Sequence, residues 1–123
     1  MTIIISPSIL GGSFSNMEKT ILEINESKAE YIHFDVMDGD FVPNLTFGPQ
    51  FIYNLRSYTN KVFDVHLMIN RVEKFIDNYI EAGSDIISFH VEIEDDIKSL
   101  ISRIKKNNIK CGIAIKPKTP WNR

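Results

Sequence analysis

The chain has a single cysteine, no long apolar run and no block of positive charge among its 123 residues. Cys111 alone excludes an internal disulfide framework, and its apolar neighbours predict a small buried residue without a catalytic role. No apolar run approaches the roughly 18 residues that span a bilayer, and residues 1–5 lack a signal-peptide pattern. We therefore expect a cytoplasmic protein with no membrane partner. A net charge of −2 with scattered lysines argues against a nucleic-acid partner.

Short apolar runs alternate with segments of helical period, which predicts an α/β fold with a parallel sheet. Five strands are expected, at residues 3–8, 31–37, 62–68, 85–91 and 110–115. Four helices are expected between them. The first begins at a capping box of Ser15 and Glu18, and the second covers residues 50–56. The third begins at a cap of Asn70 and Glu73 and ends at Gly83, and the fourth covers residues 97–104. Periodicity alone fits either a five-stranded doubly wound sheet or the first part of an eight-stranded barrel, which needs roughly 200 residues or more.

Polar side chains recur at alternate positions of the first four predicted strands. The residues expected to share a face are Ser6 and Ser8; His33, Asp35 and Met37; Asp64, His66 and Met68; and Ser88, His90 and Glu92. In a barrel, alternate strand residues point at the axis, and active groups lie near the carboxyl ends of the strands. The pattern therefore favours a site built from neighbouring strands.

Two imidazoles and a carboxylate on neighbouring strands can bind a divalent cation such as zinc, iron, manganese or cobalt. A single His-x-Asp pair is usually a hydrogen-bonded pair in a core, but here His33 and Asp35 are followed by Asp64 and His66. The second pair strengthens the interpretation as a metal site.

Other polar and sulfur-containing residues leave two interpretations open. Isolated methionines usually fill gaps in a core, yet Met37 and Met68 lie beside candidate site residues. Ser8 either ends a strand and caps a turn or contacts a ligand. The remaining residues have ordinary structural explanations: His90 and Glu92 as a hydrogen-bonded strand end, and Asp38 and Asp40 as a solvated turn around Gly39.

Five segments, in the right order, resemble those of the ribulose-phosphate 3-epimerase family over almost the whole chain. They are Ser6-Pro7-Ser8-Ile9-Leu10, the block His33-Phe34-Asp35-Val36-Met37-Asp38-Gly39-Asp40-Phe41-Val42-Pro43-Asn44, Asp64-Val65-His66-Leu67-Met68, Phe89-His90, and residues 112–120. The second and third segments together are highly specific.

The resemblance implies a (β/α)8 TIM barrel, of which residues 1–123 would be the N-terminal part of one domain. It implies an isomerase that interconverts D-ribulose 5-phosphate and D-xylulose 5-phosphate at carbon 3, in the pentose phosphate pathway, with one divalent metal. The full-length family is commonly oligomeric. The implied roles are metal ligation for His33, Asp35 and His66, acid/base catalysis for Asp35, and substrate contact for Ser8, His66, Met37 and Met68.

The family draws its second catalytic carboxylate, also a metal ligand, and its glycine-rich phosphate-binding loops from strands late in the barrel. This chain contains no counterpart of them, and Lys116 stands where the family usually has asparagine. The chain therefore looks truncated. Inversion needs proton transfer on both faces of a planar intermediate, and open sheet edges favour aggregation. We expect the 123-residue chain alone to be poorly stable and nearly inactive.

Three alternatives remain. A related epimerase, such as one acting on allulose 6-phosphate, would use the same metal and the same acid/base chemistry. A non-catalytic fragment could still bind metal. A signalling receiver module is disfavoured, because a receiver needs an acidic pair after its first strand, where this chain has Ser6-Pro7-Ser8.

Overall fold

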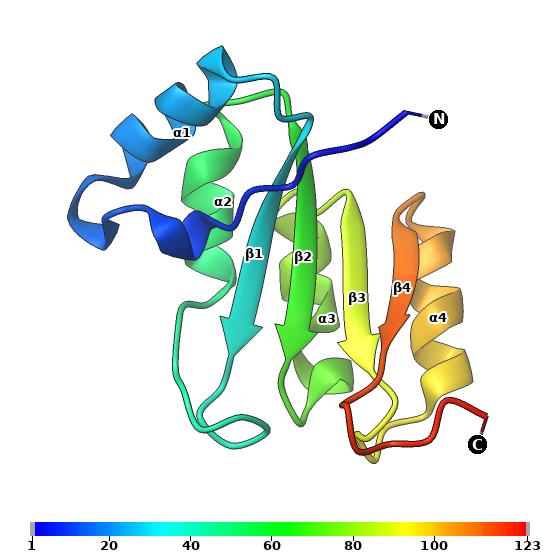
Figure 1. The fold of residues 1–123 in the computed structure, drawn as a ribbon. Helices are drawn as coiled ribbons and strands as arrows, with labels where there is room; N and C mark the ends of the chain where they lie inside the picture. Colours follow the sequence, from blue (N-terminus) through cyan, green and yellow to red (C-terminus); the bar gives the residue numbers. More distant parts are fainter. Residues whose placement is uncertain (1, 123) are drawn as a thin grey trace.

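A computed structural model describes residues 2–122, which form a parallel sheet of four strands (Figure 1). The strands are β1 (Tyr31–Met37), β2 (Val62–Met68), β3 (Ile86–His90) and β4 (Lys110–Ala114). Each strand pairs in parallel with the next one along the chain, in the order β1-β2-β3-β4. A doubly wound sheet reverses its strand order at a switch point, whereas a barrel does not. The observed order is consistent with part of a TIM barrel.

The described residues also contain four α-helices and two short 3-10 helices, of which the first three precede β1 and the other three connect the strands. They are η1 (Ile9–Gly11), η2 (Phe14–Asn16), α1 (Met17–Glu26), α2 (Pro49–Arg56), α3 (Val72–Glu81) and α4 (Ile97–Lys106). The four α-helices lie on one face of the sheet, and the loops that follow the strands gather at its lower edge (Figure 1). None of the helices in the described part of the chain is long and apolar enough to cross a membrane.

The hydrophobic core lies between the sheet and these helices. In β1 and β2 every second residue is buried, including Phe34 and Phe63, whose rings are 4.7 Å apart. The intervening residues are only half-buried, because they project from the other face. Cys111 packs against the core but is half-buried rather than fully buried, and burial raises the pKa of its thiol. The helix-free face is therefore available to polar residues.

The first of the five predicted strands is not a regular strand, so residues 2–122 form four strands instead of five. Residues 3–7 run beside β1, where Ile5 and Pro7 carbonyls accept hydrogen bonds from Tyr31 and His33, and Ser8 forms an isolated bridge to His33. The reciprocal donors are missing: Pro7 has no N–H, and the N–H of Ile5 donates to the carboxylate of Glu30. The segment contributes acceptors only, which leaves its ladder half formed.

Both predicted helix caps are wrong. Ser15 lies in η2, and the cap of α1 is Asn16, whose side chain accepts from the N–H of Lys19. At α3, Arg71 occupies the cap position without a side-chain bond. The N–H of Glu73 donates instead to Asp95, a residue from the loop after β3. Capping by a residue distant in sequence cannot be recognised from local pattern.

Candidate metal centre

The register of β1 and β2 brings the predicted polar residues together. Asp35 lies opposite His66, and His33 lies opposite Asp64. All four project from the face of the sheet that carries no α-helix, as the alternation of burial along both strands indicates. Each of these side chains is between about one-fifth and one-quarter exposed. They are thus shielded in part but remain open to a ligand.

His33, Asp35 and His66 form a group that can hold a metal ion, with one donor atom from each residue lying within 4.8 Å of the others. Oδ1 of Asp35 lies 2.9 Å from Nε2 of His33 and 3.1 Å from Nδ1 of His66. With tetrahedral metal bonds of about 2.0–2.2 Å, neighbouring ligand atoms lie about 3.3–3.6 Å apart, so a cation would fit once the two imidazoles move a few tenths of an ångström away from Asp35. Two imidazole nitrogens and a carboxylate suit zinc, iron, manganese or cobalt.

The second nitrogen of His33 is held by a carboxylate on β2. Nδ1 of His33 lies 2.8 Å from Oδ2 of Asp64, which also accepts a hydrogen bond from the hydroxyl of Ser6 at 3.2 Å. The bond to Asp64 raises the pKa of His33, and the same bond is the main reason that the pKa of Asp64 is lowered. Carboxylates in this position orient metal-binding histidines in other proteins.

The second nitrogen of His66 is held by another imidazole. Nε2 of His66 lies 2.8 Å from Nε2 of His90, and the two ring planes are inclined by 25° with centroids 4.9 Å apart, so the rings meet edge to edge. Nδ1 of His90 lies 3.1 Å from Oε1 of Glu92, and both carboxylate oxygens of Glu92 accept from the backbone N–H of Lys116. Burial lowers the pKa of His66, which favours the neutral imidazole that a metal ion requires.

The loop after β1 is tied down beside this group. Asp38 accepts backbone hydrogen bonds from Asp40, Phe41 and Asn70, so the predicted turn residue also joins its loop to the end of β2. Burial alone would raise the pKa of Asp38, but these three bonds lower it overall. Nζ of Lys116 donates to the carbonyl of Phe41 and lies 3.8 Å from the centroid of its ring. Lys116 therefore connects the segment after β4 to the loop after β1.

The remaining predicted site residues lie close to the metal-binding group in the register. Met37 and Met68 face each other at the carboxyl ends of β1 and β2, one step beyond Asp35 on the same face. Ser8 is the bridge partner of His33, and its hydroxyl accepts from the N–H of Leu10 at the start of η1. The predicted capping interpretation of Ser8 is thus confirmed, while its contact with substrate stays a prediction.

Sequence reasoning missed the hydrogen bonds that support the metal ligands. Asp64 and His90 lie on the expected face, and Glu92 follows in the loop after β3, but their partners depend on strand register, which the sequence alone does not give. The sequence signal that could have found them is the alternation of polar residues, which continues from residues 31–37 and 62–68 into Ser88, His90 and Glu92. His90 and Glu92 do form a hydrogen-bonded strand end, and that end reaches His66.

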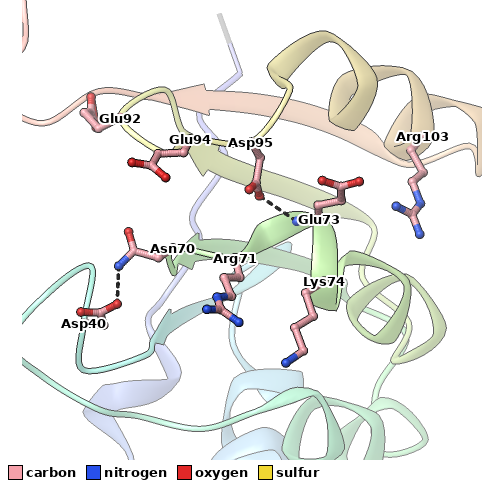
Figure 2. Close-up of a pocket in the computed structure, with 9 residues that line it drawn as sticks. All are labelled: Asp40, Asn70, Arg71, Glu73, Lys74, Glu92, Glu94, Asp95 and Arg103. Atoms are coloured by element: carbon pink, nitrogen blue, oxygen red, sulfur yellow. Dashed lines mark hydrogen bonds between the residues drawn. The ribbon is translucent and has the colours of Figure 1, made fainter.

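A charged groove of about 900 Å³ lies next to the group without containing its donor atoms (Figure 2). Its lining is mostly ionic and consists of Asp40, Asn70, Arg71, Glu73, Lys74, Glu92, Glu94, Asp95 and Arg103. Hydrogen bonds from Asn70 to Asp40 and from Glu73 to Asp95 cross it. Glu92 stands at the edge of the groove and is the residue that this groove shares with the network around His66.

Comparison with known proteins agrees with these observations. Residues 4–123 match the model of the ribulose-phosphate 3 epimerase family. The chain is 41% identical over 116 residues to a ribulose-phosphate 3-epimerase of Treponema pallidum, covering 94% of this chain and 53% of that protein. Identity is 44% to the enzyme of Rhodobacter capsulatus (94% and 51% covered) and 42% to that of Synechocystis (96% and 52% covered). The chain spans about half the length of these relatives, and it belongs to the ribulose-phosphate 3-epimerase family.

Proposed function

We propose that residues 1–123 are the N-terminal part of a single (β/α)8 barrel that interconverts D-ribulose 5-phosphate and D-xylulose 5-phosphate. In this proposal the chain contributes the metal ligands His33, Asp35 and His66. The observation that carries it is the convergence of three donor atoms within 4.8 Å on neighbouring strands of a chain that belongs to this family. A divalent cation bound there would stabilise negative charge developing on the oxygens of carbons 2 and 3.

Asp35 is the acid/base group in this proposal. Within the described residues, both histidine contacts of its side chain are made by Oδ1, the atom that would hold the cation. Oδ2 is therefore the atom that can take the proton from carbon 3 on one face of the substrate and return it. Ligation of a cation through Oδ1 would hold the carboxylate in place, which limits the motion needed before proton transfer.

Substrate contacts complete the proposal. Met37 and Met68 present polarisable, uncharged surface beside Asp35, and Ser8 lies next to His33. A methionine lining offers no group that competes with Asp35 for the proton. The opposing carboxylate and the phosphate-binding loops would come from the second half of the barrel, so we expect very low turnover from residues 1–123 alone.

Zinc binding provides the direct test of the metal centre. Titration of the chain with Zn²⁺ in the presence of a competing chelator should reveal one site. The variants His33→Gln, Asp35→Asn and His66→Gln should each weaken binding by more than about 100-fold, because each removes a ligand rather than a neighbour of one. Asp77→Asn is the matched control, since Asp77 is exposed on α3 and pairs with Arg103.

Activity distinguishes the proposal from the two alternatives that share its chemistry. D-ribulose 5-phosphate and D-allulose 6-phosphate should be supplied in parallel to the zinc-loaded chain, and any residual turnover should favour the pentose phosphate. Failure to bind zinc would overturn the metal centre. Zinc binding with no reaction at carbon 3 on either sugar would leave a metal-binding fragment.

A further inference from the structure

We propose that His90 and Glu92 form a positioning pair that fixes the ring of His66 with Nδ1 toward Asp35. The inference rests on the metal centre proposed above and concerns residues outside its ligand set. His90 ends β3, and Glu92 lies in the loop that follows. Together with His66 they form a hydrogen-bonded series that starts at the metal-binding group and ends at the backbone N–H of Lys116.

The protons in this series can be arranged in one way when Nδ1 of His66 binds a cation. A ligand nitrogen must carry a lone pair, so the proton of neutral His66 lies on Nε2 and donates to Nε2 of His90. His90 then carries its own proton on Nδ1, which donates to Oε1 of Glu92. Glu92, as a carboxylate, only accepts. Each member thus determines the tautomer of the one before it.

Packing holds His90 in the orientation that this arrangement requires. Its ring packs against the ring of Phe41, with centroids 5.0 Å apart, while Nε2 meets the edge of the His66 ring. The residue is 8% exposed. Glu92 is held in turn by the N–H of Lys116, at 3.2 Å from each oxygen. Buried groups with every hydrogen bond satisfied have few alternative positions.

Small residues on the neighbouring strands leave room for His90 to reach His66. The residue directly opposite His66 on β3 is Ser88, and the residue opposite Ser88 on β4 is Gly112. A Cβ atom at position 112 would lie 3.0 Å from Cβ of Ser88. The side chain that completes the surroundings of His66 therefore comes from the next inward-facing position on β3, which is His90.

The test compares variants that keep or remove the acceptor at position 90. His90→Leu removes it, whereas His90→Gln keeps one acceptor oxygen and one donor nitrogen. Zinc affinity should fall about 10- to 100-fold in the leucine variant, the usual cost of losing an outer partner, and return to within about threefold in the glutamine variant. In ¹⁵N NMR spectra of the zinc-loaded parent chain, the proton of His66 should reside on Nε2. Circular dichroism would verify that both variants are folded.

Glu92 offers a second, independent comparison. Glu92→Ala should lower zinc affinity about threefold to tenfold, because His90 loses the acceptor that sets its tautomer. Glu94→Ala is the matched control: it removes one carboxylate from the same loop and the same groove, where Glu94 is exposed (Figure 2). An equal fall in zinc affinity for both variants would mean that the loss of negative charge alone explains the effect, and it would overturn the inference.

The remaining outcomes separate the two proposals. If the parent chain binds no zinc, the metal centre fails and this inference fails with it. If the parent binds zinc and His90→Leu binds it equally well, the inference alone fails. Equal losses in the leucine and glutamine variants would assign His90 a packing role and overturn the positioning role. A proton on Nδ1 of His66 in the zinc-loaded chain would do the same.

Discussion

Nδ1 of His33 lies 2.8 Å from Oδ2 of Asp64 on the adjacent strand, and this hydrogen bond leaves Nε2 of the same ring facing Asp35. The pairing follows from register, because His33 and Asp64 are directly opposite each other in the parallel ladder of β1 and β2. The motif Asp64-Val65-His66 thus contributes one candidate metal ligand and orients another. Asp64 orients the histidine of the neighbouring strand, while His66 approaches Asp35 itself.

Replacing Asp64 should weaken metal binding according to whether an acceptor remains. Asp64→Leu leaves Nδ1 of His33 without a partner, and we expect zinc affinity to fall about 10- to 100-fold. Asp64→Asn keeps an acceptor oxygen and should lower affinity less than about fivefold. Chelator competition would measure both values, with Asp77→Asn as the surface control. Equal affinities for the leucine variant and the parent would show that Asp64 does not orient the ligand.

Asp35 should exchange a substrate proton even where inversion is absent. With one acid/base group on one face, the zinc-loaded chain is expected to incorporate deuterium at carbon 3 of one of the two pentulose phosphates in D₂O, without forming its epimer. Proton NMR would follow the loss of the carbon 3 signal at millimolar substrate. Asp35→Asn should abolish the exchange. Exchange in both sugars at equal rates would mean that a second group acts on the opposite face.

The strands and helices in the middle of the chain were predictable because short-range pattern determines them. The alternation over residues 31–37 and 62–68 gives the observed bounds of β1 and β2, and the apolar stripe of α3 ends just before Gly83, whose φ of +99° suits glycine. The first segment has the same apolar pattern but fails as a strand. Its N–H groups are missing at Pro7 or bound to Glu30, and sequence pattern does not reveal that competition.

The metal-binding group was also visible in the sequence, but its supporting bonds were not. His33, Asp35 and His66 follow from the period-two pattern and the expectation that neighbouring strands pair. The bond from His66 to His90 joins residues 24 positions apart on strands whose relative register no local signal sets. The bond from Lys116 to Phe41 spans 75 positions and depends on how two loops meet.

The phenol of Tyr79 should lose its proton at a higher pH than an exposed tyrosine, because it is buried. Its side chain is 4% exposed, and burial, with a smaller effect of the charge on Asp38, raises its pKa to about 12. Because the pKa of Tyr79 is higher in the folded chain than the value of about 10 in the unfolded chain, the neutral phenol contributes to the free energy of unfolding below pH 10. This contribution is lost as the pH rises from about 10 to 12. Absorbance at alkaline pH should thus resolve one late-titrating tyrosine. Tyr79→Phe should remove that phase and reduce the fall of stability above pH 10.

Phe34 should be among the most sensitive core positions. It is fully buried on β1 and contacts the rings of Phe47 and Phe63, at 6.1 and 4.7 Å between centroids. Phe34→Ala should cost about 3–5 kcal/mol of unfolding free energy, which is a large share of a small domain's stability. Urea denaturation followed by circular dichroism would measure the change. Tyr53→Ala is the control, because Tyr53 is 61% exposed on α2 and should change stability little.

The two outer edges of the sheet should make the 123-residue chain associate with itself. Ile3 is 77% exposed beside β1, and Ile113 is 46% exposed on β4, so apolar side chains accompany unpaired backbone groups at both edges. Such edges template pairing with other chains, and a charged residue on the edge suppresses it. Ile3→Lys combined with Ile113→Lys should shift the chain toward monomer in size-exclusion chromatography with light scattering. Leu22→Lys is the matched control, since Leu22 is 47% exposed on α1. An equal shift by the control would trace the association to surface hydrophobicity in general and not to the sheet edges.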